Sequence, residues 1–240
     1  MHEGIAFVCR AVTVTTRGDD PAVDESMPSG AGKLTAEWPQ AESDLPQWQA
    51  WNKAIEAAVQ EMALQKPAAN ASPKTTPKWA AVQETDIDLT TAIHVATDSL
   101  VTTSIVNSWY SHGAAHPNTA STQFNWLLKE RRTLRPEDVF SARSGWDHFL
   151  EERSDKYLHQ QLDADIGRSY DTFSSPAEMA KTLHEIVIDP ANWRIDDAGL
   201  TIVFQQYAVA CYACTPSPVS IPWSELRPLL NQSFAVPTKP

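Results

Sequence analysis

Hydrophobic positions in the first half of the chain follow two different periods. After Pro46 they recur at steps of three and four residues, which predicts an amphipathic helix that ends at Pro67. The apolar stripe of this helix consists of Trp48, Trp51, Ile55, Val59 and Met62. From Asp86 the period changes to two, which predicts a half-buried strand. Its apolar positions are Ile87, Leu89, Ile93 and Val95.

Further strands are predicted where β-branched and aromatic residues gather between turn signals. They cover residues 6–15, 33–38, 100–109 and 121–128. Glycines and prolines between residues 18 and 30 mark the segment after the first strand as a loop. Three prolines between residues 67 and 78 mark a connector to the next element, and residues 136–140 read as a short helical turn.

Two longer helices are predicted next. The first covers about residues 145–163, and Arg153 and Ser154 interrupt its buried stripe. Its apolar positions are Trp146, Phe149, Leu150, Tyr157, Leu158 and Leu162. The second begins at the capping box of residues 175–178, with proline at the first helical position, and ends at Pro190.

The last part of the chain returns to strands. The turn sequence at residues 196–199 joins predicted strands at residues 193–195 and 200–204. Residues 207–214 continue the second of these strands or begin another, and residues 219–221 form a short strand. A final helix begins at Pro222, and Pro228 limits it to its first turns.

Helices and strands do not alternate regularly, and short turns join consecutive strands. This order predicts an α+β fold, in which an antiparallel sheet of about four to six strands carries helices on one face. We expect residues 1–30 to be an N-terminal strand with a flexible segment and residues 31–240 to form a single domain. The parts of that domain are an N-terminal strand and helix at 33–66, the proline-rich connector at 67–78 and a main part at 79–230.

Acidic residues outnumber basic residues by 30 to 19, which gives a formal net charge of −11. Basic side chains gather only at Lys129, Arg131, Arg132 and Arg135. A nucleic-acid partner needs a concentrated basic face to neutralise phosphates, so we expect none. A basic protein partner fits the charge better, because opposite fields speed encounter. The alternative is that the negative charge serves solubility alone.

No stretch of the sequence approaches the roughly 20 apolar residues of a membrane span. The start of the chain lacks the features of a secretory signal. Its apolar run, Ile5 to Val8, is short, and it has neither a basic start nor a small-residue cleavage site. Either the protein stays in the cytoplasm, or an export signal is absent from this sequence.

The three cysteines are Cys9, Cys211 and Cys214. Cys211 and Cys214 have the spacing of a redox motif, but Pro216 and Pro218 prevent the helix that a thioredoxin-like site needs. A zinc site would need a second pair of ligands. A structural disulfide between Cys211 and Cys214 is therefore the favoured interpretation, with Cys9 as a competing partner.

The densest group of reactive side chains lies between two predicted strands. It consists of Tyr110, Ser111, His112, Gly113, Ala114, Ala115, His116, Pro117 and Asn118. Histidines four residues apart match the spacing of zinc peptidases, but Gly113 and Pro117 oppose a helix and the following glutamate is absent. A Ser–His–Asp arrangement with Ser111 would need a distant carboxylate. The simplest interpretation is a loop that connects strands, and we expect no metal or other cofactor.

This loop also carries a family resemblance. Tyr110 followed by residues 113–118 resembles the Gly-Gly-Ala-His-Pro signature of RsiV-type domains, which also occurs in a module attached to some bacterial peptidoglycan deacetylases. The sequence departs from the signature at Ala114, where the family has its second glycine. Other matching pieces follow in order between about residues 33 and 230. They are residues 38–39, 51–55, 124–125, 134–140, 199–204, 207–209 and 219–226.

The resemblance implies an extracytoplasmic domain, either periplasmic or in the cell envelope, where a stand-alone relative could be a lipoprotein. In anti-sigma factors of the RsiV type this domain binds lysozyme. We therefore expect a non-enzymatic module that recognises a basic peptidoglycan hydrolase or antibacterial effector as sensor, inhibitor or immunity protein. The loop at residues 110–118 is the candidate binding site. Two alternatives stay open: a glycan-binding accessory domain, and a hydrolase built on His112, His116 and a distant carboxylate.

Overall fold

The computed structural model describes most of the chain. The described residues are 5–16, 32–64, 85–111, 114–166, 175–210 and 216–238. Several sequence features lie outside them: the loop after the first strand, the proline-rich connector, His112, Gly113, Cys211 and Cys214. The predicted domain boundary at residue 30 also lies outside the described part.

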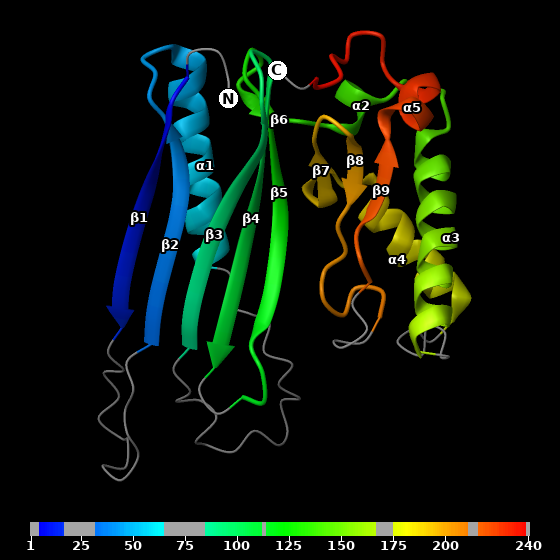
Figure 1. Cartoon of the computed structure of the whole chain (residues 1–240), viewed down its shortest axis with the longest axis horizontal. Coiled ribbons are helices and arrows are strands. Elements are labelled where there is room, and N and C mark those ends of the chain that lie inside the picture. Colours follow the sequence, from blue (N-terminus) through cyan, green and yellow to red (C-terminus); the bar gives the residue numbers. More distant parts are fainter. Residues whose placement is uncertain are drawn as a thin grey trace. The chain divides into compact units, whose positions relative to one another are not determined.

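The first half of the chain forms a six-stranded sheet in which the strands follow one another in sequence order (Figure 1). Its strands are β1 (Phe7–Thr16), β2 (Gly32–Ala41), β3 (Thr85–Ala96), β4 (Leu100–Ser111), β5 (Asn118–Leu127) and β6 (Arg132–Thr133). Thr97 closes the turn between β3 and β4, because its backbone N–H donates to the Leu100 carbonyl at 2.8 Å. The predicted strands are thus present, and β2 runs further than expected.

Pairing within this sheet is mixed. β1 pairs antiparallel with β2 along its whole length, whereas β2 pairs parallel with β3 from Leu34 to Ala36. The parallel pair departs from the antiparallel arrangement that the sequence predicts. Pro39 does not end β2 because it lies beyond the paired stretch with β3, where a missing N–H removes no bond to that strand.

The predicted amphipathic helix is α1 (Pro46–Leu64), and all members of its apolar stripe are buried. Trp48 and Trp51 contact each other and Phe7 of β1 in edge-to-face geometry, with ring centroids 5.6 to 6.0 Å apart. Asn52, on the same helix, bonds both backbone groups of Ala41: its carbonyl oxygen accepts from the N–H, and its amide donates to the C=O. These contacts fasten the helix to the end of β2.

The second half of the chain forms a three-stranded sheet with helices (Figure 1). The elements are α2 (Pro136–Val139), α3 (Trp146–Ile166), α4 (Pro176–Ile188), β7 (Trp193–Ile195), β8 (Gly199–Ile202), β9 (Val219–Pro222) and α5 (Trp223–Leu226). Both pairs in this sheet, β7 with β8 and β8 with β9, are antiparallel. The final helix is short, as predicted, and continues only as a 3-10 turn over Arg227–Leu229.

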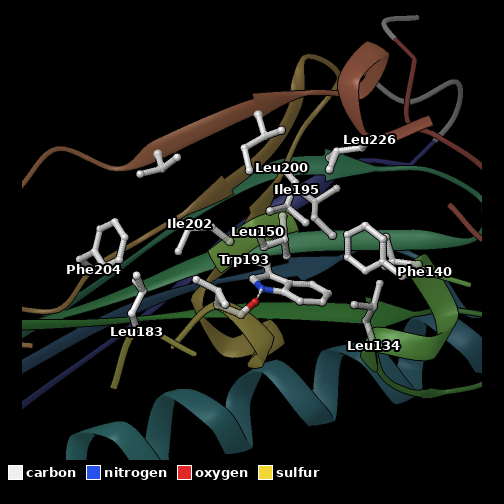
Figure 2. Packing of buried hydrophobic residues seen from close by; sticks show 14 of the residues in the cluster. Leu134, Phe140, Leu150, Leu183, Trp193, Ile195, Leu200, Ile202, Phe204 and Leu226 are labelled. Atoms are coloured by element: carbon white, nitrogen blue, oxygen red, sulfur yellow. Dashed lines mark hydrogen bonds between the residues drawn. The ribbon is translucent and has the colours of Figure 1, made fainter. Parts of the chain in front are cut away.

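A hydrophobic core fills this second half, with Trp193 in the middle of the packed side chains (Figure 2). Trp193 is fully buried and contacts the rings of Phe140 and Trp146 edge-on at 5.5 and 5.8 Å. Its indole N–H donates to the carbonyl of Val187 at 2.8 Å, which satisfies one of the open carbonyls at the end of α4. The predicted cap of α4 is present too, because the Ser175 hydroxyl accepts from the N–H of Glu178.

Two local expectations are wrong. Ser154 does not interrupt the stripe of α3, because it is fully buried between Leu150 and Leu158 and supplies a small side chain at that position. Residues 207–210 form a turn and bends instead of a strand. Tyr207 has a φ of 62°, which lies in the left-handed region and cannot continue β8.

The chain divides into two compact units, and the division falls within β3, β4 and β5. One unit contains residues 5–91 and 105–120, and the other contains residues 92–104 and 121–240. Side chains tie the strand segments of the second unit to its C-terminal part. Thr102 donates to the Ile195 carbonyl, Asn125 donates to the Trp193 carbonyl, and Gln205 bonds both backbone groups of Ser121. The α+β fold class is confirmed, with a second sheet added.

Candidate functional site

A pocket of about 290 Å³ lies beside the predicted loop, within the unit that contains β1, β2 and α1. Three strands and the loop line it. The lining residues are Lys33, Thr35, Asp86, Ile87, Asp88, Ser108, Trp109, Tyr110 and Pro117. Tyr110 and Pro117 belong to the predicted site, whereas the residues of β2 and β3 were not expected there.

Tyr110 marks the loop side of the pocket. Its side chain is 37% exposed, which is high for a large aromatic residue on a strand. Its hydroxyl donates to the carbonyl of Ala114 at 3.1 Å, and the Ala114 N–H donates to the carbonyl of Ser111 at 2.9 Å. These bonds hold the ring in place while one part of it stays accessible, an arrangement typical of aromatic anchors in binding sites.

Two aspartates of β3, Asp86 and Asp88, are among the residues that line the pocket. The Asp86 carboxylate accepts from the backbone N–H of Lys33 at 2.9 Å, and Asp88 accepts from the Thr35 hydroxyl. The second bond joins residues that are directly paired in the parallel ladder. The aspartates therefore brace β2 against β3. A carboxylate offers about four acceptor positions, so the bond to Thr35 leaves Asp88 capacity for a ligand.

The other predicted loop residues have local partners. The Ser111 hydroxyl lies 3.1 Å from that of Thr85, and His116 Nδ1 lies 2.9 Å from the carbonyl of Pro117. A carbonyl only accepts, so Nδ1 of His116 carries the proton of that bond. Ala115 is exposed, and Asn118 is the first residue of β5. His112 and Gly113 lie outside the described residues.

Metal and nucleophile arrangements were the chemical alternatives for this loop. Within the described ranges, no three His, Cys, Asp or Glu side chains are grouped closely enough to hold a metal ion. The Ser111 hydroxyl is partnered with Thr85, and the Nδ1 of His116 with a backbone carbonyl. Cys9 is an exposed free cysteine, and the predicted disulfide between Cys211 and Cys214 lies outside the described residues.

A serine and a histidine do meet in the other unit. Nε2 of His94 lies 2.6 Å from the Ser104 hydroxyl, which donates its proton to the Gln123 side-chain carbonyl at 2.6 Å. A hydroxyl has one proton, so Ser104 accepts from His94. A nucleophilic serine would need to donate to its histidine instead. The chain of bonds therefore cross-links three strands and does not form an activated serine.

The environment of His94 gives a first testable prediction. Burial lowers the pKa of His94 below its ordinary value of 6.5, and Arg194 lowers it further, while Asp196 opposes the shift. The unfolded chain thus binds a proton more readily than the folded protein. The free energy of unfolding that neutral His94 contributes is fully present above pH 6.5. It is lost as the pH falls through the lowered pKa of the folded protein.

We expect the free energy of unfolding of the wild-type protein to fall more steeply than that of His94→Gln as the pH is lowered from 7.5 to 5. Denaturant titrations of both proteins at each pH measure the difference. A difference between the two proteins that does not change with pH would contradict the prediction.

The family match among the comparisons with known proteins lies in the second half of the chain. Residues 137–224 match a family described as "Protein of unknown function (DUF3298)". The matched segment runs from α2 into α5 and includes most of the core around Trp193, but it excludes the pocket. None of the curated proteins matches the chain.

Solved structures of DUF3298 proteins share the fold over almost the whole chain. A member from Bacteroides fragilis is 18% identical, covers 96% of this chain and 95% of its own, and gives a TM-score of 0.61. A member from Pseudomonas aeruginosa is 14% identical, covers 95% of both chains, and gives a TM-score of 0.59. At these identities the likeness to DUF3298 structures concerns the fold alone. The chemistry of the pocket must therefore be argued from the residues of this chain.

Sequence reasoning missed the aspartates of β3 and the start of β2. A signal was present: Lys33 and Thr35 are polar at alternate positions, as are Asp86 and Asp88. Alternate residues of a strand share a face, so each pair predicts a polar strand face. What the alternation could not provide was the parallel pairing that places these two faces side by side.

Of the described helices, none is both long and apolar enough to cross a membrane.

Proposed function

We propose that this chain is a non-catalytic binding domain of the cell envelope that recognises a basic, lysozyme-like peptidoglycan hydrolase. The observation that carries the proposal is the accessible ring of Tyr110 beside a pocket with two aspartates, at the loop that resembles the RsiV-type signature. Such a domain would act as a sensor, an inhibitor or an immunity protein. The extracytoplasmic location is part of the proposal and rests on the same resemblance.

Physical complementarity supports this choice of partner. Tyrosine is enriched among residues that dominate binding energy, because it buries a large surface at low entropic cost. Asp86 and Asp88 offer acceptors for lysine or arginine side chains of the partner, and the chain carries a net charge of −11. An acidic protein attracts a basic enzyme over several ångströms, which increases the association rate at low salt.

The binding prediction concerns Tyr110 and Asp88. With a basic lysozyme as the probe, titration calorimetry is expected to show stoichiometric binding at micromolar affinity or tighter. Tyr110→Ala should weaken binding by roughly tenfold or more, as for an aromatic anchor. Asp88→Asn should reduce the association rate and its salt dependence while it keeps an acceptor for Thr35.

The matched control is Glu61→Gln, which makes the same change of charge at an exposed position on α1. It should bind like the wild type. Equal effects of Asp88→Asn and Glu61→Gln on binding would show that only the net charge of the protein affects the association. The pocket would then not be the binding site. If lysozyme and a panel of other wall hydrolases do not bind, the proposal is wrong.

A second candidate function is recognition of cell-wall glycan. It is favoured by the presence of two aromatic residues, Trp109 and Tyr110, with two carboxylates in one pocket lining. Sugar rings stack on aromatic side chains and their hydroxyls donate to carboxylates. Soluble peptidoglycan fragments serve as the probe. Binding of fragments that Tyr110→Ala abolishes, without binding of any hydrolase, would favour this function.

A further inference from the structure

The outer edge of the six-stranded sheet is formed by β1, the end strand in the sheet order (Figure 1). β1 pairs with β2 through ten consecutive residues, from Phe7 to Thr16, without a bulge. Among the residues that the structure describes, no strand pairs with its other edge. Along that edge, alternate N–H and C=O groups point away from the sheet, and such a row is a template for another strand.

β1 has few of the features that protect sheet edges. Proteins usually cover a free edge, shorten it, bend it with a bulge, or place lysine or proline on it. This strand is long, contains neither glycine nor proline, and is rich in valine and threonine. Residues 9–13 are all exposed, and Val12 is 40% exposed. Arg10 is its one charged residue.

We propose that β1 pairs with β1 of a second copy of this chain, antiparallel and across a two-fold axis perpendicular to the sheet. A strand of the same length and twist matches the open edge, and the pairing joins two sheets into one. The local charge also favours this edge for self-association. The chain as a whole is strongly acidic, whereas residues 5–16 contain no aspartate or glutamate.

Geometry limits the register of this pairing. Side chains alternate between the two faces, and residues directly opposite each other share a face. A two-fold axis perpendicular to the sheet places the same face of β1 on the same side of the joined sheet in both copies. Odd-numbered residues can therefore face only odd-numbered residues of the copy, and even-numbered residues only even-numbered ones. The two-fold axis then passes beside a single residue of β1.

Charge then excludes one register, and we choose among the others by the length of the pairing and the size of the side chain on the axis. An axis beside Arg10 would place two arginines opposite each other, which is unfavourable. An axis beside Ala11 places Arg10 opposite Val12 of the copy and pairs every residue of β1 from Phe7 to Thr15. In this register the small Ala11 side chains meet on the axis.

The register makes position 12 a test with two opposite outcomes. Val12→Lys places a lysine opposite Arg10 of the copy, twice per dimer, whereas Val12→Glu places a carboxylate there. Light scattering over a concentration series is expected to show a wild-type dimer. Val12→Lys should weaken it by roughly tenfold, and Val12→Glu should leave it intact or strengthen it. Added salt should strengthen the wild-type dimer, because it screens the repulsion between two acidic chains.

Cysteine cross-linking tests the register independently. In a Cys9→Ser background, Ala11→Cys places two thiols opposite each other, with Cα atoms about 4.5 to 5.5 Å apart, within reach of a disulfide. The control Thr13→Cys places them about four residues apart along the strands, roughly 13 Å. Mild oxidation should cross-link the first variant and not the second.

Three results would overturn the proposal. The first is a wild-type protein that stays monomeric up to about millimolar concentration. The second is a dimer to which Val12→Lys and Val12→Glu do equal damage, and the third is equal cross-linking at positions 11 and 13. The pocket variants Tyr110→Ala and Asp88→Asn should dimerise normally, so loss of hydrolase binding and loss of dimerisation are separate results.

Discussion

Replacing Trp193 with alanine is expected to lower the free energy of unfolding by about 3–5 kcal/mol, the usual cost of emptying a buried tryptophan site. The side chain is fully buried in the core of the second half of the chain. Its removal leaves a cavity beside Phe140 and Trp146 and leaves the Val187 carbonyl without its donor. Chemical denaturation monitored by circular dichroism measures the loss.

Tyr110→Ala serves as the control for the removal of a large aromatic ring. Its ring is already partly in water, so the loss should be clearly smaller than that of Trp193→Ala. Trp193→Phe should fall between the two variants, because it keeps most of the packing and loses the hydrogen bond. A loss below about 1 kcal/mol for Trp193→Ala would show that the core can collapse around the missing ring.

Gly199→Ala is expected to destabilise the protein by more than about 3 kcal/mol, although it adds a single methyl group. A Cβ at this position would lie 2.1 Å from the backbone oxygen of Ile221, so β9 would have to move away from β8. Gly199 is directly paired with Pro222 in that ladder. Thermal and denaturant unfolding of the variant measure the effect.

Gly145→Ala separates this steric clash from backbone preference. Gly145 has a φ of 71°, but nothing lies within 4 Å of an added Cβ. The expected cost is about 1 kcal/mol, from the left-handed conformation alone. If the two variants lose equal stability, close approach of β9 is not what requires glycine at position 199.

Local elements of this fold could be predicted from the sequence because their signals are local. The helical period of α1, the Ser175 cap of α4 and the turn before Gly199 each depend on residues within a few positions of one another. Ser154 was misjudged because a small polar residue in an apolar stripe has no distinctive pattern. Its neighbours on the helix decide its burial.

The candidate site was predicted only in part, for a reason of topology. Tyr110 and Pro117 were identified because they lie in one short segment with an unusual composition. Lys33 and Asp86 are 53 positions apart in sequence, and only the parallel pairing of β2 with β3 brings them together. Parallel neighbours need a long connection, and nothing in either segment specifies the other as its partner.

The bonds from Thr102 to Ile195 and from Ser121 to Gln205 set an order of events during synthesis. They join positions 93 and 84 residues apart within one compact unit. The ribosome makes residues 92–104 long before β7 and Gln205, so this unit cannot complete its core until those later residues have emerged. High separation between contacting residues also slows folding, since long loops must close before their contacts form. The segments of β3, β4 and β5 in this unit therefore stay incompletely packed until β7 and Gln205 have been synthesised.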